Sequence, residues 1–319
     1  MRIVLVGAVE STRVALEVLA AHPDATLAAL VTLPPDKAVR HADWLDLRPP
    51  AAAAGVPVIE ATDVNAHDVL DAIALSQPDF LFVIGWSQIC RRGLLDLARE
   101  GSIGYHPAPL PENRGRAVIP WTILQGRTDT GATLFWMDDG VDSGEILVQH
   151  RFPIAADETA QSLYDKHMTV LAAMLEESLP QLGSSPPRIP QDHQRATWCA
   201  RRRPDDALID WARPADAVWT LVRACGDPYP GAFSFHRGRR LVVWECELRG
   251  PGPYWGLPGQ VQAILGEGAL VQCGDGGHVL LATVEIDAGG RCPAAELLGA
   301  HDRLGLDLLA LVTSDQGRR

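Results

Sequence analysis

The strands in the first half of the chain are marked by continuous apolar runs. "RIVLVG" (residues 2–7) precedes the helical pattern "RVALEVLAAH" (13–22), which Ser11 or Thr12 is expected to cap. Strands that are buried on both faces and alternate with helices predict a doubly wound, mostly parallel, Rossmann-like α/β sheet. Further apolar runs occupy residues 27–32, 56–61 and 80–85, and a helical pattern occupies residues 68–75.

The pattern changes in the second half. Strand patterns at 131–138 and 145–154 flank the turn "DGVDSG", and residues 162–182 have helical spacing. Residues 183–213 are rich in Pro, Ser and Arg without periodicity, which predicts a linker. Short strands at glycine-marked intervals then predict a small, mainly β, barrel-like domain. The expected organisation is a catalytic domain at 1–182, a linker at 183–213 and a C-terminal domain at 214–312.

Composition limits the function classes. The 319 residues exceed one compact core, and 47% apolar with 21% charged residues indicates a soluble globular protein. There are 28 Lys and Arg against 40 Asp and Glu, a formal charge of -12 that lacks the footprint of a nucleic-acid binder. The six cysteines form no CxxC pair and are expected to be reduced core residues. No apolar run has membrane-spanning length, so we expect a cytoplasmic protein without a membrane partner.

One histidine and one aspartate stand out as candidate catalytic groups. His106 follows a short strand ending near Ile103, and ligands of open α/β sheets bind beyond the carboxyl ends of strands. Asp142 lies in a glycine-punctuated turn, where its carboxylate can orient an imidazole. Taken alone, an isolated histidine is more often satisfied by backbone groups, and such an aspartate more often forms a turn. Only Gly7 precedes the first helix, so the GxGxxG fingerprint of dinucleotide-binding dehydrogenases is missing.

The stretch "HPAPLPENRGRAVIPWTILQGRTDTGATLFWMDDGVDSGEIL" closely resembles the core of the 10-formyltetrahydrofolate-dependent formyltransferases, the family of methionyl-tRNA and nucleotide-sugar formyltransferases. The family's His-x-x-Leu-Leu-Pro loop matches His106 to Pro111, its Arg-Gly pair matches Arg114 and Gly115, and its Asp-x-Gly-x-Asp-x-Gly turn matches Asp138 to Gly144. Residues 209–248 are similar to the family's C-terminal β domain, so the resemblance covers essentially the whole chain.

The resemblance implies transfer of a formyl group from 10-formyltetrahydrofolate, as co-substrate, to an amine, without a metal. His106 would be the polarising donor or proton shuttle, and Asp142 its orienter and a route for the amine's proton. Main-chain groups at 83–87 would read the pterin, with Trp86 lending aromatic surface. The expected cofactor-binding residues are Val83, Ile84, Gly85, Trp86, Ser87, Leu110, Pro111, Asp139, Gly140 and Val141. The expected substrate-binding residues are Tyr105, Pro107, Ala108, Asn113, Arg114 and Arg201.

The chain departs from the family at Gly104, where the motif Asn-x-His has its asparagine. That asparagine donates to the formyl oxygen, and losing one oxyanion donor typically costs about 2.7–4 kcal/mol, or roughly a hundred- to thousandfold in rate. Three interpretations are open: a replacement donor (Asn113, Tyr105 or a water), altered one-carbon chemistry, or folate binding without turnover. The matches at His106 and Asp142 favour a replacement donor.

The acceptor amine is the remaining question. The loop at 33–50 is basic in tRNA-acting relatives, but here its three basic and three acidic residues cancel. Arg201, Arg202 and Arg203 form one basic run, which is either a solvated linker or, with Arg114, a phosphate site. "RGRAVIPW" and "RRRPDDALIDW" look most like the domain that acts on UDP-4-amino-4-deoxy-arabinose. We therefore expect an amino-sugar nucleotide. Methionyl-tRNA, a free amino acid and a natural-product amine are the alternatives, and a homo-oligomer is compatible with the sequence.

Overall fold

The chain forms two compact units. The structure is a computed structural model that describes residues 1–40 and 43–306. The first unit comprises residues 1–122, 127–156 and 162–201, and the second comprises 123–126, 157–161 and the chain from Arg202. Residues 183–201, within the stretch whose composition predicts a linker, belong to the first unit. The expected C-terminal boundary, residue 312, lies outside the described residues.

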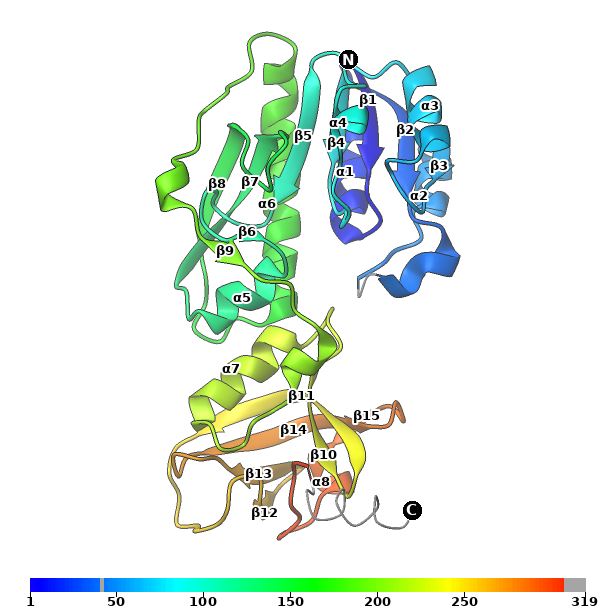
Figure 1. The fold of residues 1–319 in the computed structure, drawn as a ribbon. Coiled ribbons are helices and arrows are strands. Elements are labelled where there is room, and N and C mark those ends of the chain that lie inside the picture. Colours follow the sequence, from blue (N-terminus) through cyan, green and yellow to red (C-terminus); the bar gives the residue numbers. More distant parts are fainter. Residues whose placement is uncertain (41–42, 307–319) are drawn as a thin grey trace, which may run out of the picture. The chain divides into compact units, whose positions relative to one another are not determined.

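The first unit is built on a seven-stranded sheet in the order β3-β2-β1-β4-β5-β7-β8 (Figure 1). The first five strands are parallel, and β7 and β8 are antiparallel, which confirms the predicted mostly parallel sheet. Chain order reverses between β1 and β4, the place where open α/β sheets bind ligands. The strands are β1 (Arg2–Val6), β2 (Thr26–Thr32), β3 (Val58–Glu60), β4 (Phe80–Val83), β5 (Gly101–His106), β7 (Asp129–Trp136) and β8 (Ile146–Pro153).

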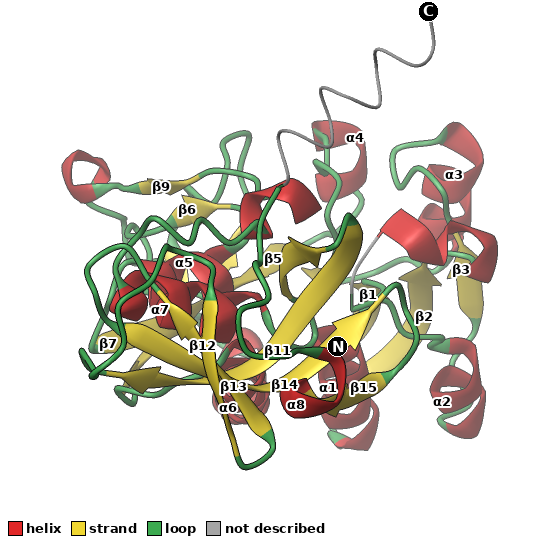
Figure 2. Ribbon diagram, turned by 90° about the horizontal axis from the view of Figure 1, so that it is seen from below, coloured by secondary structure: helices red, strands yellow, loops and turns green. Residues whose placement is uncertain are grey.

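Helices cover both faces of this sheet (Figure 2). Leu16 of α1, Ala51 of α2 and Leu171 of α6 share one buried cluster, whereas Ile73 of α3 and Leu94 of α4 belong to the other. Each cluster also takes alternate residues of the strands, because successive side chains of a strand point to opposite faces. The helices are α1 (Glu10–Ala21), α2 (Arg48–Ala53), α3 (His67–Leu75), α4 (Arg92–Leu95), α5 (Val118–Leu124) and α6 (Ala160–Leu182), with the 3-10 turns η1 (Pro35–Arg40) and η2 (His193–Arg195).

The start of α1 differs from the prediction. The helix begins at Glu10 with Val9 as the residue before it, so capping by Ser11 or Thr12 is wrong. The chain turns into the helix immediately after β1, which leaves Thr12 inside the first turn. Its Oγ1 accepts the Val9 N–H at 3.2 Å and donates to the Ile84 carbonyl at 2.7 Å. Thr12 therefore ties the helix to the segment that follows β4.

The second unit is built on an antiparallel sheet, which α7 and α8 accompany among the residues described up to 306. Its strand order is β10-β11-β14-β13-β12, and β15 pairs with β14, which confirms a mainly β domain. Its elements are η3 (Pro204–Ala207), α7 (Ala215–Cys225), β10 (Ala232–His236), β11 (Arg239–Arg249), β12 (Val261–Leu265), β13 (Gly268–Gln272), β14 (His278–Ile286), β15 (Arg291–Pro293) and α8 (Ala294–Leu297).

All six cysteines lie among the described residues as free thiols. Four are buried, and burial raises the pKa of Cys90 and Cys273 to about 12. These thiols stay protonated near neutral pH, as expected of core residues. Among the described helices, none is both long and apolar enough to cross a membrane.

Candidate active site

His106 ends β5 at the carboxyl edge of the sheet, one strand away from the point between β1 and β4 where strand order reverses. Its side chain is 6% exposed. In the antiparallel pairing with β7, Gly104 lies opposite Phe135 and His106 opposite Thr133. Paired residues share a face, so these four lie on the face opposite to Ile103 and Tyr105.

A short segment connects His106 to Asp142. The His106 Nε2–H donates to the Asn113 carbonyl at 2.8 Å, and the Gly115 N–H donates to Asp142 Oδ2, also at 2.8 Å. The same Oδ2 lies 3.6 Å from His106 Nδ1. Because Nε2 is committed to a carbonyl, Nδ1 is the ring nitrogen that faces the carboxylate, at a separation just longer than a hydrogen bond. The predicted pair is thus brought together by residue 115 of β6 (Arg114–Gly115) and by residue 113, which directly precedes that strand.

The turn that carries Asp142 has its own supports. Asp142 has a φ of 51°, a left-handed conformation that Asp tolerates better than most residues. Asp138 Oδ1 accepts from the Gly140 N–H at 3.0 Å and from Ser143 Oγ at 2.7 Å. Gln191 Nε2 donates to the carbonyls of Asp142 at 3.0 Å and Gly144 at 2.6 Å. Gln191 was not predicted as a site residue, because it lies in an aperiodic stretch and acts through a single side-chain amide.

Arg114 carries a buried guanidinium that contacts Gln191, the residue that also holds the Asp142 turn. It is 3% exposed, and its Nη2 donates to Gln191 Oε1 at 2.6 Å and to His193 Nδ1 at 3.0 Å. Its guanidinium carbon lies 5.6 Å from the centre of the Trp198 ring, in β9 (Trp198–Cys199), which pairs with β6. Within the described part of the chain, Arg114 pairs with no carboxylate and its buried Nε has no hydrogen-bond partner. A guanidinium left without a counter-ion suits an anionic ligand.

The segment after β4 contains one buried hydrogen-bond donor, the Trp86 indole N–H, that no described residue pairs with. The Ile84 N–H donates to the Val6 carbonyl at 2.9 Å, and the Gly85 carbonyl accepts from Ala8 at 3.1 Å in a turn where Gly85 has a φ of 77°. By contrast, Trp86 Nε1 is buried with no partner among the described residues. Neighbouring Val83 is buried, and the Ser87 carbonyl accepts from Arg116 Nη2 at 3.3 Å.

The space beside Gly104 is filled by an aromatic ring. A Cβ at residue 104 would lie 2.8 Å from Cε1 and Cζ of Phe135 and 3.2 Å from Cγ of Met137. Phe135 is 4% exposed, so the ring is packed on all sides. The position that resembles the family asparagine therefore has neither a side chain nor room for one, as the structure stands.

The predicted replacement donors Asn113 and Tyr105 lie on different sides of β5. Asn113 is buried next to His106, and its N–H donates to Thr197 Oγ1 at 2.8 Å. Tyr105 points to the opposite face, where its hydroxyl is 3.2 Å from Nδ1 of His167 on α6. His167 is fully buried, which, together with an electrostatic contribution from nearby His106, lowers its pKa to about 3. The Tyr105 hydroxyl is therefore not brought to the site.

The loop after His106 is held by its main chain. Thr133 Oγ1 donates to the Ala108 carbonyl at 2.7 Å, and Gln149 Nε2 donates to the Leu110 carbonyl at 2.8 Å. The Pro111 carbonyl accepts from the Thr197 N–H at 3.3 Å. Ala108 and Leu110 are buried, and Pro107 is half-buried.

The other predicted site residues lie at the surface of the first unit. Asp139, Gly140 and Val141 are exposed, with Asp139 Oδ1 3.5 Å from Arg92 Nε. Arg201 is exposed, and no described residue forms an ion pair or hydrogen bond with its side chain. The described residues hold no cluster of three or more His, Cys, Asp or Glu placed for a metal ion.

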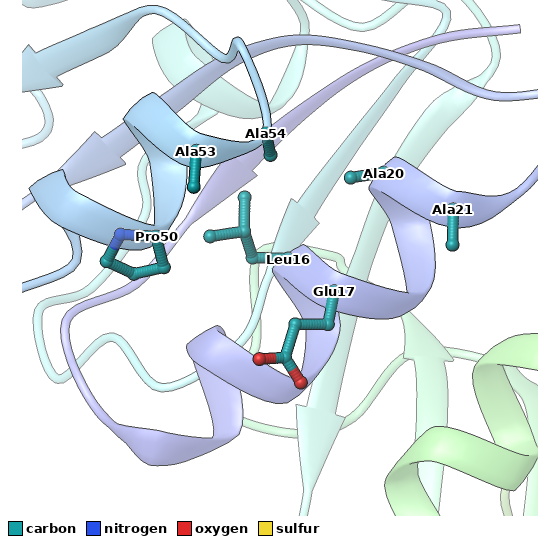
Figure 3. Close-up of a pocket in the computed structure, with 7 residues that line it drawn as sticks. All are labelled: Leu16, Glu17, Ala20, Ala21, Pro50, Ala53 and Ala54. Carbon is teal, nitrogen blue, oxygen red and sulfur yellow. The ribbon is translucent and has the colours of Figure 1, made fainter.

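Of two cavities in the first unit, one adjoins these elements and the other lies apart from them. One of about 230 Å³ lies between the turn at 138–144 and residues 188–193, and Gln191 and His193 line it. Another, of about 390 Å³, lies between α1 and α2 (Figure 3). Glu17 is the one charged side chain that lines the second cavity, and none of the predicted site residues reaches it. Its lining is Leu16, Glu17, Ala20, Ala21, Pro50, Ala53 and Ala54.

Comparisons with known proteins place this chain in a family. The formyl transferase model matches residues 1–179, and the formyl transferase C-terminal domain model matches residues 202–301. A methionyl-tRNA formyltransferase of Moorella thermoacetica is 30% identical over 98% of this chain and 100% of its own length.

Solved structures share the fold. HypX from Aquifex aeolicus in complex with tetrahydrofolic acid matches with a TM-score of 0.66 at 18% identity, over 94% of this chain. The match spans about half of HypX, 47% of that chain. An N-formyltransferase from Helicobacter canadensis, in complex with folinic acid and dTDP-3-aminofucose, matches with a TM-score of 0.62 at 16% identity, over 88% of this chain and 98% of that one. The chain is therefore a formyl-transferring enzyme that belongs to the 10-formyltetrahydrofolate-dependent formyltransferase family.

Proposed function

We propose that His106 and Asp142 carry formyl transfer from 10-formyltetrahydrofolate to a primary amine of a small molecule, an amino-sugar nucleotide. One observation carries the catalytic assignment. The carbonyl of residue 113 and the N–H of residue 115 hold these two side chains 3.6 Å apart at the carboxyl edge of the sheet. Arg114, which lies between residues 113 and 115 in the sequence, supplies the positive charge that binds the anionic part of the acceptor.

The folate fits the segment after β4. A pterin has ring nitrogens and an oxo group that pair with main-chain and indole groups, and Trp86 Nε1 is a buried donor that no described residue satisfies. We assign Val83 to Ser87, Leu110, Pro111 and the residues Asp139 to Val141 to this co-substrate. When bound, 10-formyltetrahydrofolate supplies the formyl carbon that the amine attacks and the N10 that leaves.

The residues of the site move one proton. The attacking amine must be neutral, and it loses a proton as its C–N bond forms. His106 Nδ1 takes that proton, and Asp142 stabilises the resulting imidazolium across the 3.6 Å gap. The same nitrogen then returns the proton to the departing N10. Asn113 keeps the ring in one orientation throughout, because its carbonyl holds the Nε2–H.

The charge distribution favours a small acceptor over a transfer RNA. The chain has only two lysines, Lys37 and Lys166. In the second unit, four exposed arginines are paired with carboxylates, which leaves them poorly suited to phosphate contacts. These pairs are Arg237 with Asp302, Arg239 with Asp287, Arg249 with Glu247 and Arg291 with Asp227. The similarity to the Helicobacter canadensis enzyme, solved with a dTDP-linked amino sugar, agrees with this choice.

Formylation of methionyl-tRNA is the second candidate. The observation in its favour is the 30% identity to the Moorella thermoacetica enzyme of that name, over nearly the whole chain. The two candidates differ in their salt dependence, because tRNA binding through phosphates weakens steeply as salt rises.

The test is mass spectrometry of candidate amines incubated with the protein and 10-formyltetrahydrofolate. We expect one formyl group to be added to an amino-sugar nucleotide by the wild type and none by His106→Ala. Filter binding of methionyl-tRNA at two salt concentrations runs in parallel. Formylated methionyl-tRNA with salt-sensitive binding, and no formylated sugar nucleotide, would overturn the small-acceptor proposal.

A further inference from the structure

Gln191 bonds both the turn that carries Asp142 and the Arg114 guanidinium, and we propose that it is a positioning residue for both Asp142 and Arg114. The inference rests on the proposed function, because it gives Gln191 its effect through those two residues. Its side chain forms no hydrogen bond with the His106 imidazole or the Asp142 carboxylate. It contacts the main chain of the Asp142 turn on one side and the Arg114 guanidinium on the other.

The side-chain amide of Gln191 uses nearly all of its hydrogen-bonding capacity. Both hydrogens of Nε2 go to carbonyls, those of Asp142 at 3.0 Å and Gly144 at 2.6 Å. Oε1 accepts from Arg114 Nη2 at 2.6 Å. A flipped amide would place its oxygen against two carbonyl oxygens and its hydrogens against a guanidinium, so a single orientation satisfies the site. Gln191 is 5% exposed, which keeps water from replacing these bonds.

The backbone around Gln191 is fixed on both sides. Before it, Ile189 and Ile146 exchange two main-chain hydrogen bonds, of 2.8 and 3.0 Å. After it, the Arg114 N–H donates to the Thr197 carbonyl at 2.9 Å and the Arg116 N–H donates to the Cys199 carbonyl at 3.1 Å. The amide is therefore presented from a docked segment and acts as a fixed support for the turn, whose Asp142 has a left-handed φ of 51°.

The effect of Gln191 on the turn can be measured at one hydrogen bond, that from the Gly115 N–H to Asp142. Asp142 Oδ2 accepts the Gly115 N–H at 2.8 Å, so a turn that loses its support should release that N–H to exchange with solvent. Gln191→Leu removes all three hydrogen bonds at similar volume. Gln191→Glu keeps an acceptor for Arg114 but turns a carboxylate oxygen toward the carbonyls of the turn, so it separates the two functions of the amide.

The first experiment measures amide hydrogen exchange at Gly115 in the full chain. We expect exchange at least about tenfold faster in Gln191→Leu and Gln191→Glu than in the wild type. Gln272→Leu is the matched control, because Gln272 is also 5% exposed but lies in the second unit. Unchanged Gly115 exchange in both Gln191 variants, with an unchanged melting temperature, would overturn the proposal.

The second experiment is a double-mutant cycle with Asp142→Asn, using water as the acceptor. In that reaction the formyl C–N10 bond breaks, a C–O bond to water forms, and a proton passes to N10, giving formate and tetrahydrofolate. We expect Gln191→Leu to lower the rate by about ten- to a hundredfold in the wild type and by less than about twofold in Asp142→Asn. Equal losses in both backgrounds would mean that Gln191 only supports the fold. A wild type that neither binds 5-formyltetrahydrofolate nor turns over would refute the proposed function, and the Gly115 exchange would still decide the role of Gln191.

Discussion

The packing of Phe135 against Gly104 predicts that a side chain at residue 104 will be tolerated only after the ring is removed. We consider Gly104→Ala first, because it adds one carbon and no donor. That carbon would lie 2.8 Å from two ring carbons of Phe135. Apolar carbons pack at about 3.5–4.0 Å, so the ring must move by roughly 0.7 Å or more. Phe135 has no free space to take up the movement, because it is 4% exposed.

The magnitude follows from two opposing contributions. Overpacking of this kind costs about 1–3 kcal/mol. Replacing glycine stiffens the unfolded chain and returns about 0.4–1 kcal/mol where the native φ is ordinary, as it is at Gly104. We therefore expect a net loss of about 1–2 kcal/mol in the free energy of unfolding, or roughly 2–8 °C in melting temperature for a unit of this size.

Phe135→Leu provides the second arm of the test, because leucine lacks the two ring atoms that the new carbon would meet. In that background Gly104→Ala should cost less than about 0.5 kcal/mol, measured by thermal unfolding of all four proteins. Gly104→Asn in the same background restores a donor, and we expect its formyl turnover to exceed that of the isosteric Gly104→Leu by about a hundred- to thousandfold. An equal cost of Gly104→Ala in both backgrounds, or a melting temperature that rises in the single variant, would refute the reasoning.

Three further predictions concern single side chains. Burial lowers the pKa of His167 from its ordinary 6.5 to about 3, so between those pH values the unfolded chain binds a proton that the folded chain does not. Stability should fall by up to about 1.4 kcal/mol per pH unit on acidification below 6.5. His167→Leu should flatten that fall in melting temperature, and an unchanged slope would contradict it. Asp142→Asn still accepts the Gly115 N–H but cannot stabilise an imidazolium, so we expect about a hundredfold or greater loss of turnover at an unchanged melting temperature; a loss below about threefold counts against the assignment. Arg114→Gln should weaken binding of UDP, measured calorimetrically, by about ten- to a hundredfold, whereas the exposed Arg249→Gln should not change it. Equal effects of the two arginine variants would rule out Arg114 as the anion site.

The sequence was sufficient to predict the sheet and the meeting of His106 with Asp142. Apolar runs and helical spacing report burial directly. The resemblance to the formyltransferase motif, and not strand direction, paired His106 with Asp142, because β7 is antiparallel to β5 and ends beside the start of that strand. It was not sufficient for Gln191 or for the ring of Phe135. Gln191 acts through one amide from an aperiodic stretch, and no periodicity marks such a contact. Phe135 matters because of the register of β7 on β5, which depends on the packing of both strands.

The two bonds made by residues 113 and 115 mean that the spacing of the catalytic pair is set by the main-chain geometry of one tight segment. This segment is a turn and not an extended strand, because Asn113 has a φ of 54° and Gly115 a φ of 104°. Few residues adopt these conformations, and a Cβ at Gly115 would lie 2.5 Å from the Cys199 carbonyl oxygen, so the spacing depends on the residue types at 113 and 115. Inserting one residue between them would change the relative direction of the carbonyl and the N–H, and His106 and Asp142 would lose their common anchor even though every catalytic side chain was still present.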